Sequence, residues 1–426
     1  MVETKVTINN PNARIITYSK ISIFLIALFA FSTSFWKYIY LLPTMRMLSL
    51  CMSALLIAFP FIRKRLEAPD IFLLLTFIPL FTNNQNIAAQ DYYFIIIYIV
   101  LVIFFVSNRE KEGWQSSGMK FMILAGIFYA SFTIWFYIDK DFYINKVIGI
   151  FPEENQRMLL IAYMRGAAAG LTKHYSLNAG LLVIGITASI SYFMAKRKSI
   201  LINIILISTM TISLLLTGKR AHIVFIAASI IVAYYLYNSN KKKGRILKIM
   251  LLIAGIVLII MLLATFIPDL NLFYTRFIET SEAGDVSLGR FMYYNQAWNI
   301  FMSNPLFGIG WGGFKYYYVN YTDVYTAVHN VYLQLLCEIG IVGCLPFLLF
   351  FITMYRNSLL LFMDVRRQKY NIGENAQRYL IFSVIIQTFF LLYCLTGNPL
   401  YDAEILFPYI YGCSLCMYYK NNLIKD

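Results

Sequence analysis

Long apolar segments separated by short polar turns make up most of this chain. Several segments approach the roughly 20 residues that a helix needs to cross a bilayer. Their apolar residues are continuous and do not alternate with polar ones, so the pattern predicts helices and not the strands of a membrane barrel. Hydropathy predicts about twelve spans. They cover residues 16–36, 45–62, 68–83, 91–107, 118–138, 176–196, 199–217, 220–237, 247–267, 329–354, 378–397 and 403–419.

Composition agrees with a membrane protein. Of the 426 residues, 60% are hydrophobic and only 13% are charged, whereas about a quarter of the residues in soluble domains are charged. We therefore expect residues 1–426 to form a single integral membrane domain of the all-α, polytopic class. The first span is too long for the apolar core of a signal peptide and lacks its cleavage site, so we expect it to stay in the membrane.

Lysine and arginine gather in every second connection between spans. They follow the second, fourth, sixth, eighth and tenth spans, and cytoplasmic loops of membrane proteins carry such an excess. The pattern predicts that both termini are cytoplasmic. The formal net charge of +15 then reflects orientation and not nucleic-acid binding, because no basic and aromatic binding module accompanies it.

Two segments on the predicted outer side are long. They cover residues 139–175 and 268–328, and the second lies between the ninth and tenth spans. Connections of this length are usually functional when they are ordered. Within the second segment, residues 287–302 have apolar positions at helical spacing. They predict an amphipathic helix, which either rests on the membrane surface or serves as a simple clamp on the bundle.

Glycines and tyrosines crowd the end of the second outer segment. Gly308, Gly310 and Gly313 match the pattern GxGxxG, but a dinucleotide site needs a βαβ unit that this sequence lacks. We expect the glycines to let backbone amides approach an anionic or sugar ligand. Gly310, Trp311 and Tyr317 are the candidate glycan contacts, although each tyrosine here is also typical of a membrane interface.

Two more polar clusters precede predicted spans on the outer side. Lys219 and Arg220 lie in a tight outer turn, against the positive-inside bias. We expect such residues to bind a phosphate group. The alternative is that their side chains only extend to the lipid headgroups. His174 and Tyr175 lie at the outer start of the sixth span, and Arg165 precedes them. We expect all three to bind substrate, with a polar helix cap as the alternative.

Four segments resemble, in this order, the O-antigen polymerase and O-antigen ligase family: SLLLTGKRAHI, SLGRFMYYNQAW, NPLFGIGWGGF and AVHNVYLQLLCEIGIVG. The resemblance is close between residues 210 and 345. It implies a multi-span glycosyltransferase of the GT-C type in the bacterial cytoplasmic membrane. Its substrates would be glycans carried by undecaprenyl diphosphate at the outer face, and a chain-length regulator and a flippase would be its partners.

The resemblance also implies roles for particular residues. The family's two arginines correspond to Arg220 and Arg290, and its histidine to His329. Transfer from a lipid diphosphate releases an anion, so the arginines suit the leaving group. His329 is the candidate base for the acceptor hydroxyl, and Asn330 is a candidate substrate-binding residue. A purely structural His329, hydrogen-bonded at a helix end, is the alternative.

We expect neither a cofactor nor a bound metal ion. Asp139 and Asp141 match the DxD pattern of some other GT-C enzymes, but they stand beside a different span and a solvated charge pair explains them. Cys413 and Cys416 have CxxC spacing without a partner pair, so packing inside a membrane helix explains them.

The choice of acceptor is less sharply defined. Ligases often show the pattern T-x-T/S-R at the turn where residues 217–220 of this chain read TGKR. A polymerase is favoured by this turn, by the KHYS cluster at 173–176 and by an intact GIGWGGF. Its product would be O-antigen, capsular or exopolysaccharide chains. A ligase that transfers finished glycan to lipid A-core or to protein is the main alternative. A lipid-linked oligosaccharide flippase is less favoured, because such transporters show internal repeats that this sequence lacks.

Overall fold

The computed structural model describes residues 20–21, 23–26, 66–82, 98–106, 113–151, 153–195, 200–238, 289–322, 326–370 and 373–423. Within these residues the regular structure is helical, which confirms the expected all-α class. The elements are α3 (Ala68–Leu75), α4 (Phe77–Thr82), α6 (Trp114–Ile138), α7 (Lys140–Phe142), the π-turn η1 (Tyr143–Val147), the 3-10 turn η2 (Ile148–Ile150), α8 (Glu153–Met164), α9 (Tyr175–Ala195), α10 (Ile200–Leu216), α11 (Arg220–Tyr237), α14 (Arg290–Ser303), α15 (Gly313–Thr322), α16 (Val331–Arg366), α17 (Glu374–Tyr393) and α18 (Ala403–Leu423).

Several of these helices are long and apolar enough to cross a membrane. Among the described residues there are five, at 114–138, 175–195, 220–237, 331–366 and 376–393. Two shorter apolar helices cover 68–79 and 200–216. The chain is thus an integral membrane protein. The expected spans at 45–62 and 247–267, and most of 16–36, lie outside the described residues, so the count of twelve stays a prediction.

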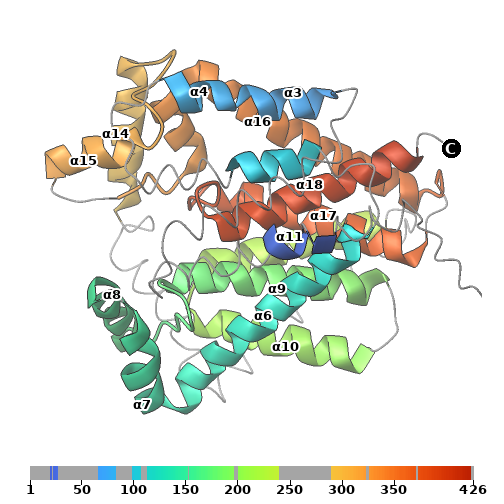
Figure 1. Cartoon of the computed structure of the whole chain (residues 1–426), viewed down its shortest axis with the longest axis horizontal. Coiled ribbons are helices and arrows are strands. Elements are labelled where there is room, and N and C mark those ends of the chain that lie inside the picture. The colour runs from blue at the N-terminus through green and yellow to red at the C-terminus, as the bar shows by residue number, and fades with distance from the viewer. Residues whose placement is uncertain are drawn as a thin grey trace, which may run out of the picture.

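The spanning helices form one bundle with α9 and α17 at its centre. α9 packs against α6, α10 and α17, and α17 also packs against α11, α16 and α18 (Figure 1). Small residues bring two of these helices together: a β-carbon at Gly126 of α6 would overlap the backbone of Gly185 on α9. Close approach through small residues is the usual way in which membrane helices associate.

α16 is broken near its start. Gly340 has φ +62° and ψ −172°, so the helix is interrupted there. Asn330 caps the first piece, because its side-chain oxygen accepts a hydrogen bond of 3.1 Å from the Leu333 amide. At the break, the backbone of residues 305–310 forms hydrogen bonds with the backbone of residues 337–342. The end of the second polar segment is therefore joined directly to a spanning helix.

The described parts of both long polar segments lie at the same end of the bundle. In Figure 1, α7 and α8 occupy the lower left and α14 and α15 the upper left, whereas the C-terminus lies at the opposite end. The helices α9, α11, α14 and α16 all begin at this left-hand end. Side chains just before or within their first turns are therefore brought together.

Candidate functional site

Polar side chains from the starts of four helices meet at this end. Lys219 precedes α11, and its ammonium nitrogen lies 5.3 Å from the ring centre of Tyr175, the first residue of α9. The charge of Lys219 acts on both His174 and His329. Arg290, the first residue of α14, also acts on His329, which precedes α16. These five residues form the candidate site.

His329 has a strained backbone. Its φ is +59°, in the left-handed region that residues other than glycine rarely adopt. Its carbonyl accepts a hydrogen bond of 3.4 Å from the Tyr294 hydroxyl, and its ring centre lies 6.3 Å from that of Tyr293. Strain of about 1–3 kcal/mol of this kind persists where the surroundings fix the backbone, and it is frequent at functional sites. Here α14 supplies that support.

His174 has a defined tautomer. Its Nδ1 accepts a hydrogen bond of 3.1 Å from the Ser176 amide, so the neutral ring carries its proton on Nε2. The hydroxyl of Thr172 donates to the carbonyl of His174 at 2.9 Å, and the hydroxyls of Ser176 and Tyr393 lie 3.3 Å apart. The ring of His174 is therefore held as a hydrogen-bond donor through Nε2.

Burial and positive neighbours keep both histidines uncharged. Burial, followed by the charges of Lys219 and Lys173, lowers the pKa of His174 to about 4. Burial, followed by the charges of Arg290 and Lys219, lowers the pKa of His329 to about 4. The ordinary pKa of histidine is near 6.5. At neutral pH the His329 ring is therefore in the state that can accept a proton.

The helix starts add positive potential to this cluster. The first turns of α9, α11, α14 and α16 contain no acidic residue, whereas α18, which also starts at this end, has Glu404 in its first turn. Acidic residues are commonly found there because each helix start carries a partial positive charge of about half an elementary charge. Lys219, Arg220 and Arg290 add three full charges at the starts of α11 and α14. The arrangement suits a polyanionic ligand.

The turn after α17 fixes the distance between α14 and α16. The Arg290 guanidinium donates to the Thr396 carbonyl at 3.1 Å. The Val331 amide donates to the Cys394 carbonyl at 2.8 Å, and the Asn330 side-chain nitrogen donates to the Leu395 carbonyl at 3.3 Å. Both polar atoms of the Asn330 side chain are thus used in the framework, as a cap and as a tie. These two bonds fix the orientation of the Asn330 side chain, and its role in substrate binding stays a prediction.

The GIGWGGF loop packs around a buried carboxylate. Glu338 of α16 is fully buried and accepts hydrogen bonds from the amides of Gly312 at 2.9 Å and Phe314 at 3.4 Å. The hydroxyl of Tyr401 donates to the same carboxylate at 2.8 Å. Sequence reasoning missed Glu338, although the signal is present: it is the sole acidic residue between 331 and 363. A carboxylate in an apolar helix requires partners.

Two loop residues expected to contact a glycan have other contacts. The Gly310 amide donates to the Glu338 carbonyl oxygen at 2.7 Å. The Trp311 side chain is 2% exposed, and its ring stacks on that of Tyr401 at 4.8 Å between centres. The loop amides thus bind the protein's own oxygen atoms, because the break in α16 exposes backbone that needs partners. This differs from the expected role in ligand binding.

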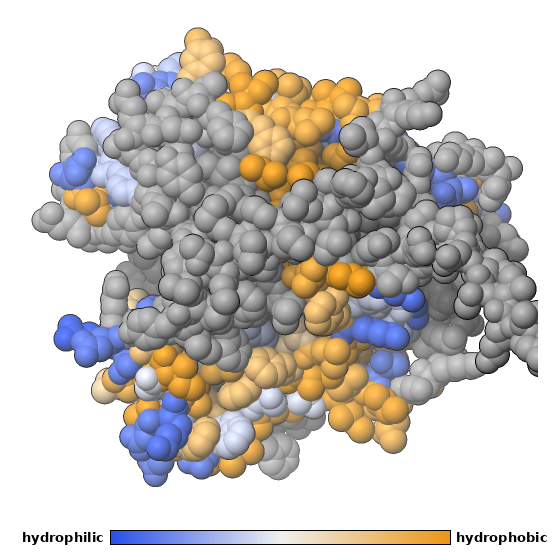
Figure 2. Space-filling model, viewed as in Figure 1, coloured by the Kyte–Doolittle hydropathy of each residue, from blue (hydrophilic) through white to orange (hydrophobic). Residues whose placement is uncertain are grey.

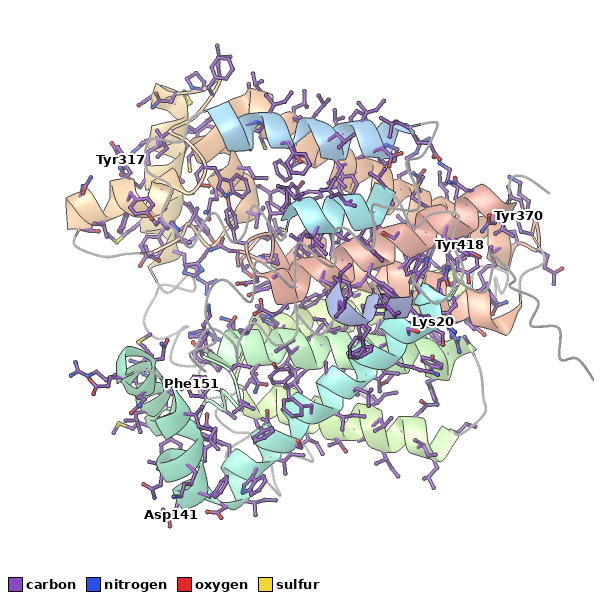
Figure 3. The ribbon with its side chains drawn as sticks, in the orientation of Figure 1. Lys20, Asp141, Phe151, Tyr317, Tyr370 and Tyr418 are labelled. Carbon is purple, nitrogen blue, oxygen red and sulfur yellow. The ribbon has the colours of Figure 1, made fainter. Side chains whose placement is uncertain are left out.

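Some expected residues lie apart from the cluster. Arg165 is exposed in the turn after α8. Tyr317 packs against the small apolar core shared by α14, α15 and α16. Figure 3 shows Tyr317 and Asp141 in separate groups of helices. Asp139 caps α7 by accepting from the Phe142 amide at 2.9 Å. In the part of the chain that the structure describes, no group of three His, Cys, Asp or Glu side chains is arranged to hold a metal ion.

Comparison with known families agrees with the resemblance noted in the sequence. Residues 205–348 match the family Wzy_C, described as O-Antigen ligase, so the recognised family is confirmed over these residues. The matched stretch contains Lys219, Arg220, Arg290 and His329, whereas His174 precedes it. No curated protein matches the chain.

Proposed function

We propose that this chain, which carries an O-antigen ligase family domain over residues 205–348, is a polysaccharide polymerase. It joins oligosaccharide repeats linked to undecaprenyl diphosphate at the outer face of the bacterial cytoplasmic membrane. The observation that carries the proposal is the meeting of four helix starts, free of acidic residues, with Lys219 and Arg290 around a neutral His329. A diphosphate ester is the anion that suits such a site.

The chemistry follows from the residues. The acceptor hydroxyl oxygen forms a bond to the anomeric carbon of the donor sugar, the bond from that carbon to the diphosphate breaks, and the lipid diphosphate leaves. His329 takes the hydroxyl proton. Arg220, Arg290 and Lys219 stabilise the charge that develops on the leaving group. His174 donates a hydrogen bond from Nε2 to the bound substrate, because its Nδ1 already accepts one from the Ser176 amide.

A largely apolar groove extends from the start of α16, next to this cluster, toward its opposite end, where Arg356 and Met363 also line it. It has a volume of about 390 Å³ and runs along α16 and α17, where Leu348, Ile352 and Leu391 line it. Tyr332 lines it too, on the first turn of α16 after His329. We assign this groove to the first isoprene units of the donor, since apolar side chains solvate a polyprenyl chain.

A ligase would use the same donor chemistry with another acceptor. Three features of the sequence favour the polymerase: the TGKR turn at 217–220, the KHYS cluster at 173–176 and an intact GIGWGGF. His174 of the second cluster interacts electrostatically with His329, which gives that cluster a direct part in the proposed site. Ligase activity on a lipid A-core or protein acceptor is therefore the second candidate.

The reaction is tested with purified protein and undecaprenyl diphosphate-linked repeats. Wild type should form long chains and release undecaprenyl diphosphate, and EDTA should not stop it. His329→Ala should lower the rate on the order of 10²–10⁴-fold if proton removal limits transfer. Arg290→Ala and Arg220→Lys should nearly abolish polymer, because a planar bidentate contact to phosphate is lost. Arg367→Ala, at the opposite end of α16, is the matched control and should retain the wild-type rate.

A deletion strain separates the candidate functions. Loss of long surface chains with single repeats still attached supports the polymerase. Long lipid-linked chains that accumulate without attachment would instead support the ligase. Repeats retained on the cytoplasmic face would support a flippase. A wild-type rate in His329→Ala would leave that residue without a catalytic part.

A further inference from the structure

α14 and the turn after it lack charge beyond the first residue of the helix. Residues 291–314 contain no Asp, Glu, Lys or Arg. Large apolar side chains are nevertheless exposed there, with 48% of Trp298, 61% of Met302, 56% of Leu306 and 64% of Phe307 accessible. Solvated segments outside membrane spans normally carry charged residues. We call these four residues the α14 corner.

The exposed side chains of the α14 corner are not the face that holds α14 to the bundle. Ala297 and Ile300 supply that face: both are buried in a small core that also contains Phe314 and Cys337. α14 packs against α16 through this core. The helix therefore presents apolar side chains on two sides, toward the protein and away from it.

The α14 corner is continuous with the outward surface of a spanning helix. The amides of Ile341 and Val342 donate to the carbonyls of Pro305 and Leu306 at 2.8 and 3.2 Å, so the turn lies directly against α16. Ile341 and Val342 are themselves 51% and 49% exposed. Figure 2 shows an apolar surface at the top of the view, over α3, α4 and α16.

We propose that the α14 corner is inserted into the outer leaflet of the membrane, so that its partner is lipid. A spanning helix that exposes apolar side chains faces acyl chains, and the α14 corner extends that surface without a charged interruption. Trp298 suits the interface between acyl chains and headgroups. Exposed amide side chains nearby, at Asn295 and Asn299, can remain hydrated among the headgroups.

Insertion of the α14 corner would set the depth of the candidate site in the membrane. Arg290 begins the helix that the α14 corner anchors, and it acts electrostatically on His329. Anchoring α14 in the leaflet sets this arginine near the headgroup layer, where the phosphates of membrane lipids lie. The anchoring itself rests on the apolar surface alone, so it stands or falls independently of the proposed reaction.

Tryptophan fluorescence in vesicles tests the insertion. The chain has five tryptophans, and full-length proteins that retain only one are reconstituted in phosphatidylcholine with brominated acyl chains. Trp298 emission should be quenched as strongly as that of Trp135, which is 45% exposed on the spanning helix α6. Trp311, 2% exposed in the core, is the unquenched control. Aqueous iodide should quench Trp298 weakly.

A milder variant serves if the single-tryptophan proteins do not fold. Trp298→Phe alone, in the otherwise unchanged protein, should remove a component of the tryptophan emission that brominated lipid quenches. Trp311→Phe should not remove such a component. If the lost component is instead quenched by iodide and not by brominated lipid, the α14 corner lies in water. If it is quenched by neither, the α14 corner is covered by protein. Either of these results overturns the proposal.

Discussion

At the residue scale, His329 combines features that are separate in the sequence. Its left-handed backbone is supported by Tyr294, and the charges of Arg290 and Lys219 help burial to lower its pKa to about 4. A base with so low a pKa is neutral but weak. A bound diphosphate would offset the two positive charges and favour the protonated ring, so its pKa should rise when the donor binds. His329 would then become a stronger base only while the donor is bound.

The pH dependence of transfer tests this coupling. His329 must be neutral to act, so activity falls as pH drops through its pKa. In the free protein that pKa is about 4, and the acid limb of kcat/KM should lie well below the ordinary pKa of 6.5. The acid limb of kcat reports the donor complex and should lie at higher pH. Both profiles are measured on purified protein with a diphosphate diester donor, which has no titrating group of its own near neutral pH.

Lys219→Gln isolates the electrostatic cause. It removes one positive neighbour, so the pKa of His329 should rise and the acid limb of kcat/KM should move to higher pH. Arg367→Gln, which lies after the far end of α16, should leave the limb unchanged. Identical acid limbs in wild type and Lys219→Gln would show that the lysine does not set the basicity.

At the element scale, the break in α16 explains why the glycine motif misled sequence reasoning. The glycines of GxGxxG suggested a ligand cradle, but Gly308 lies where a β-carbon would overlap the backbone of Glu338, and a β-carbon at Gly340 would overlap that of Leu306. This pairing joins segments about 30 positions apart, and local spacing cannot reveal it. The lone carboxylate Glu338 was the readable sign that the loop folds back onto the helix.

Gly340→Ala should therefore uncouple the loop from α16. Its φ of +62° costs alanine about 1–2 kcal/mol in the backbone alone, and the overlap with Leu306 adds to this. We expect a lower midpoint of thermal unfolding in detergent and a loss of polymer. Gly149→Ala is the matched control, because a β-carbon there meets no atom within 4 Å. Equal unfolding midpoints in the two variants would contradict the role of this break.

At the scale of the whole molecule, hydropathy predicted the described spans well and their packing poorly. The predicted ranges 118–138, 176–196 and 220–237 nearly coincide with α6, α9 and α11. For α16 the prediction stopped at 354, whereas the helix continues to Arg366 through a further apolar run at residues 359–363. The polar clusters before each span were visible in the sequence. Their meeting at one end was not, because it depends on which helices are neighbours.

The end of the bundle that carries the candidate site is expected to face outward. The site residues lie at the starts of α9, α11, α14 and α16, whereas the basic residues Arg366, Arg367 and Lys369 lie at the other end of α16. Since Lys and Arg gather on the cytoplasmic side, the site should face outward. A cysteine at Lys140 or Asn320, both exposed at the site end, should react with a membrane-impermeant maleimide in intact cells.

A cysteine at Lys369, whose side chain is 60% exposed, should react only after the cells are permeabilised. Wild type is the background control, because its described cysteines are all buried. Labelling of positions 320 and 369 from the same side would contradict the topology. It would also remove the proposed reaction, because a donor glycan presented at the outer face reaches His329 and Arg290 only if the starts of α14 and α16 face outward.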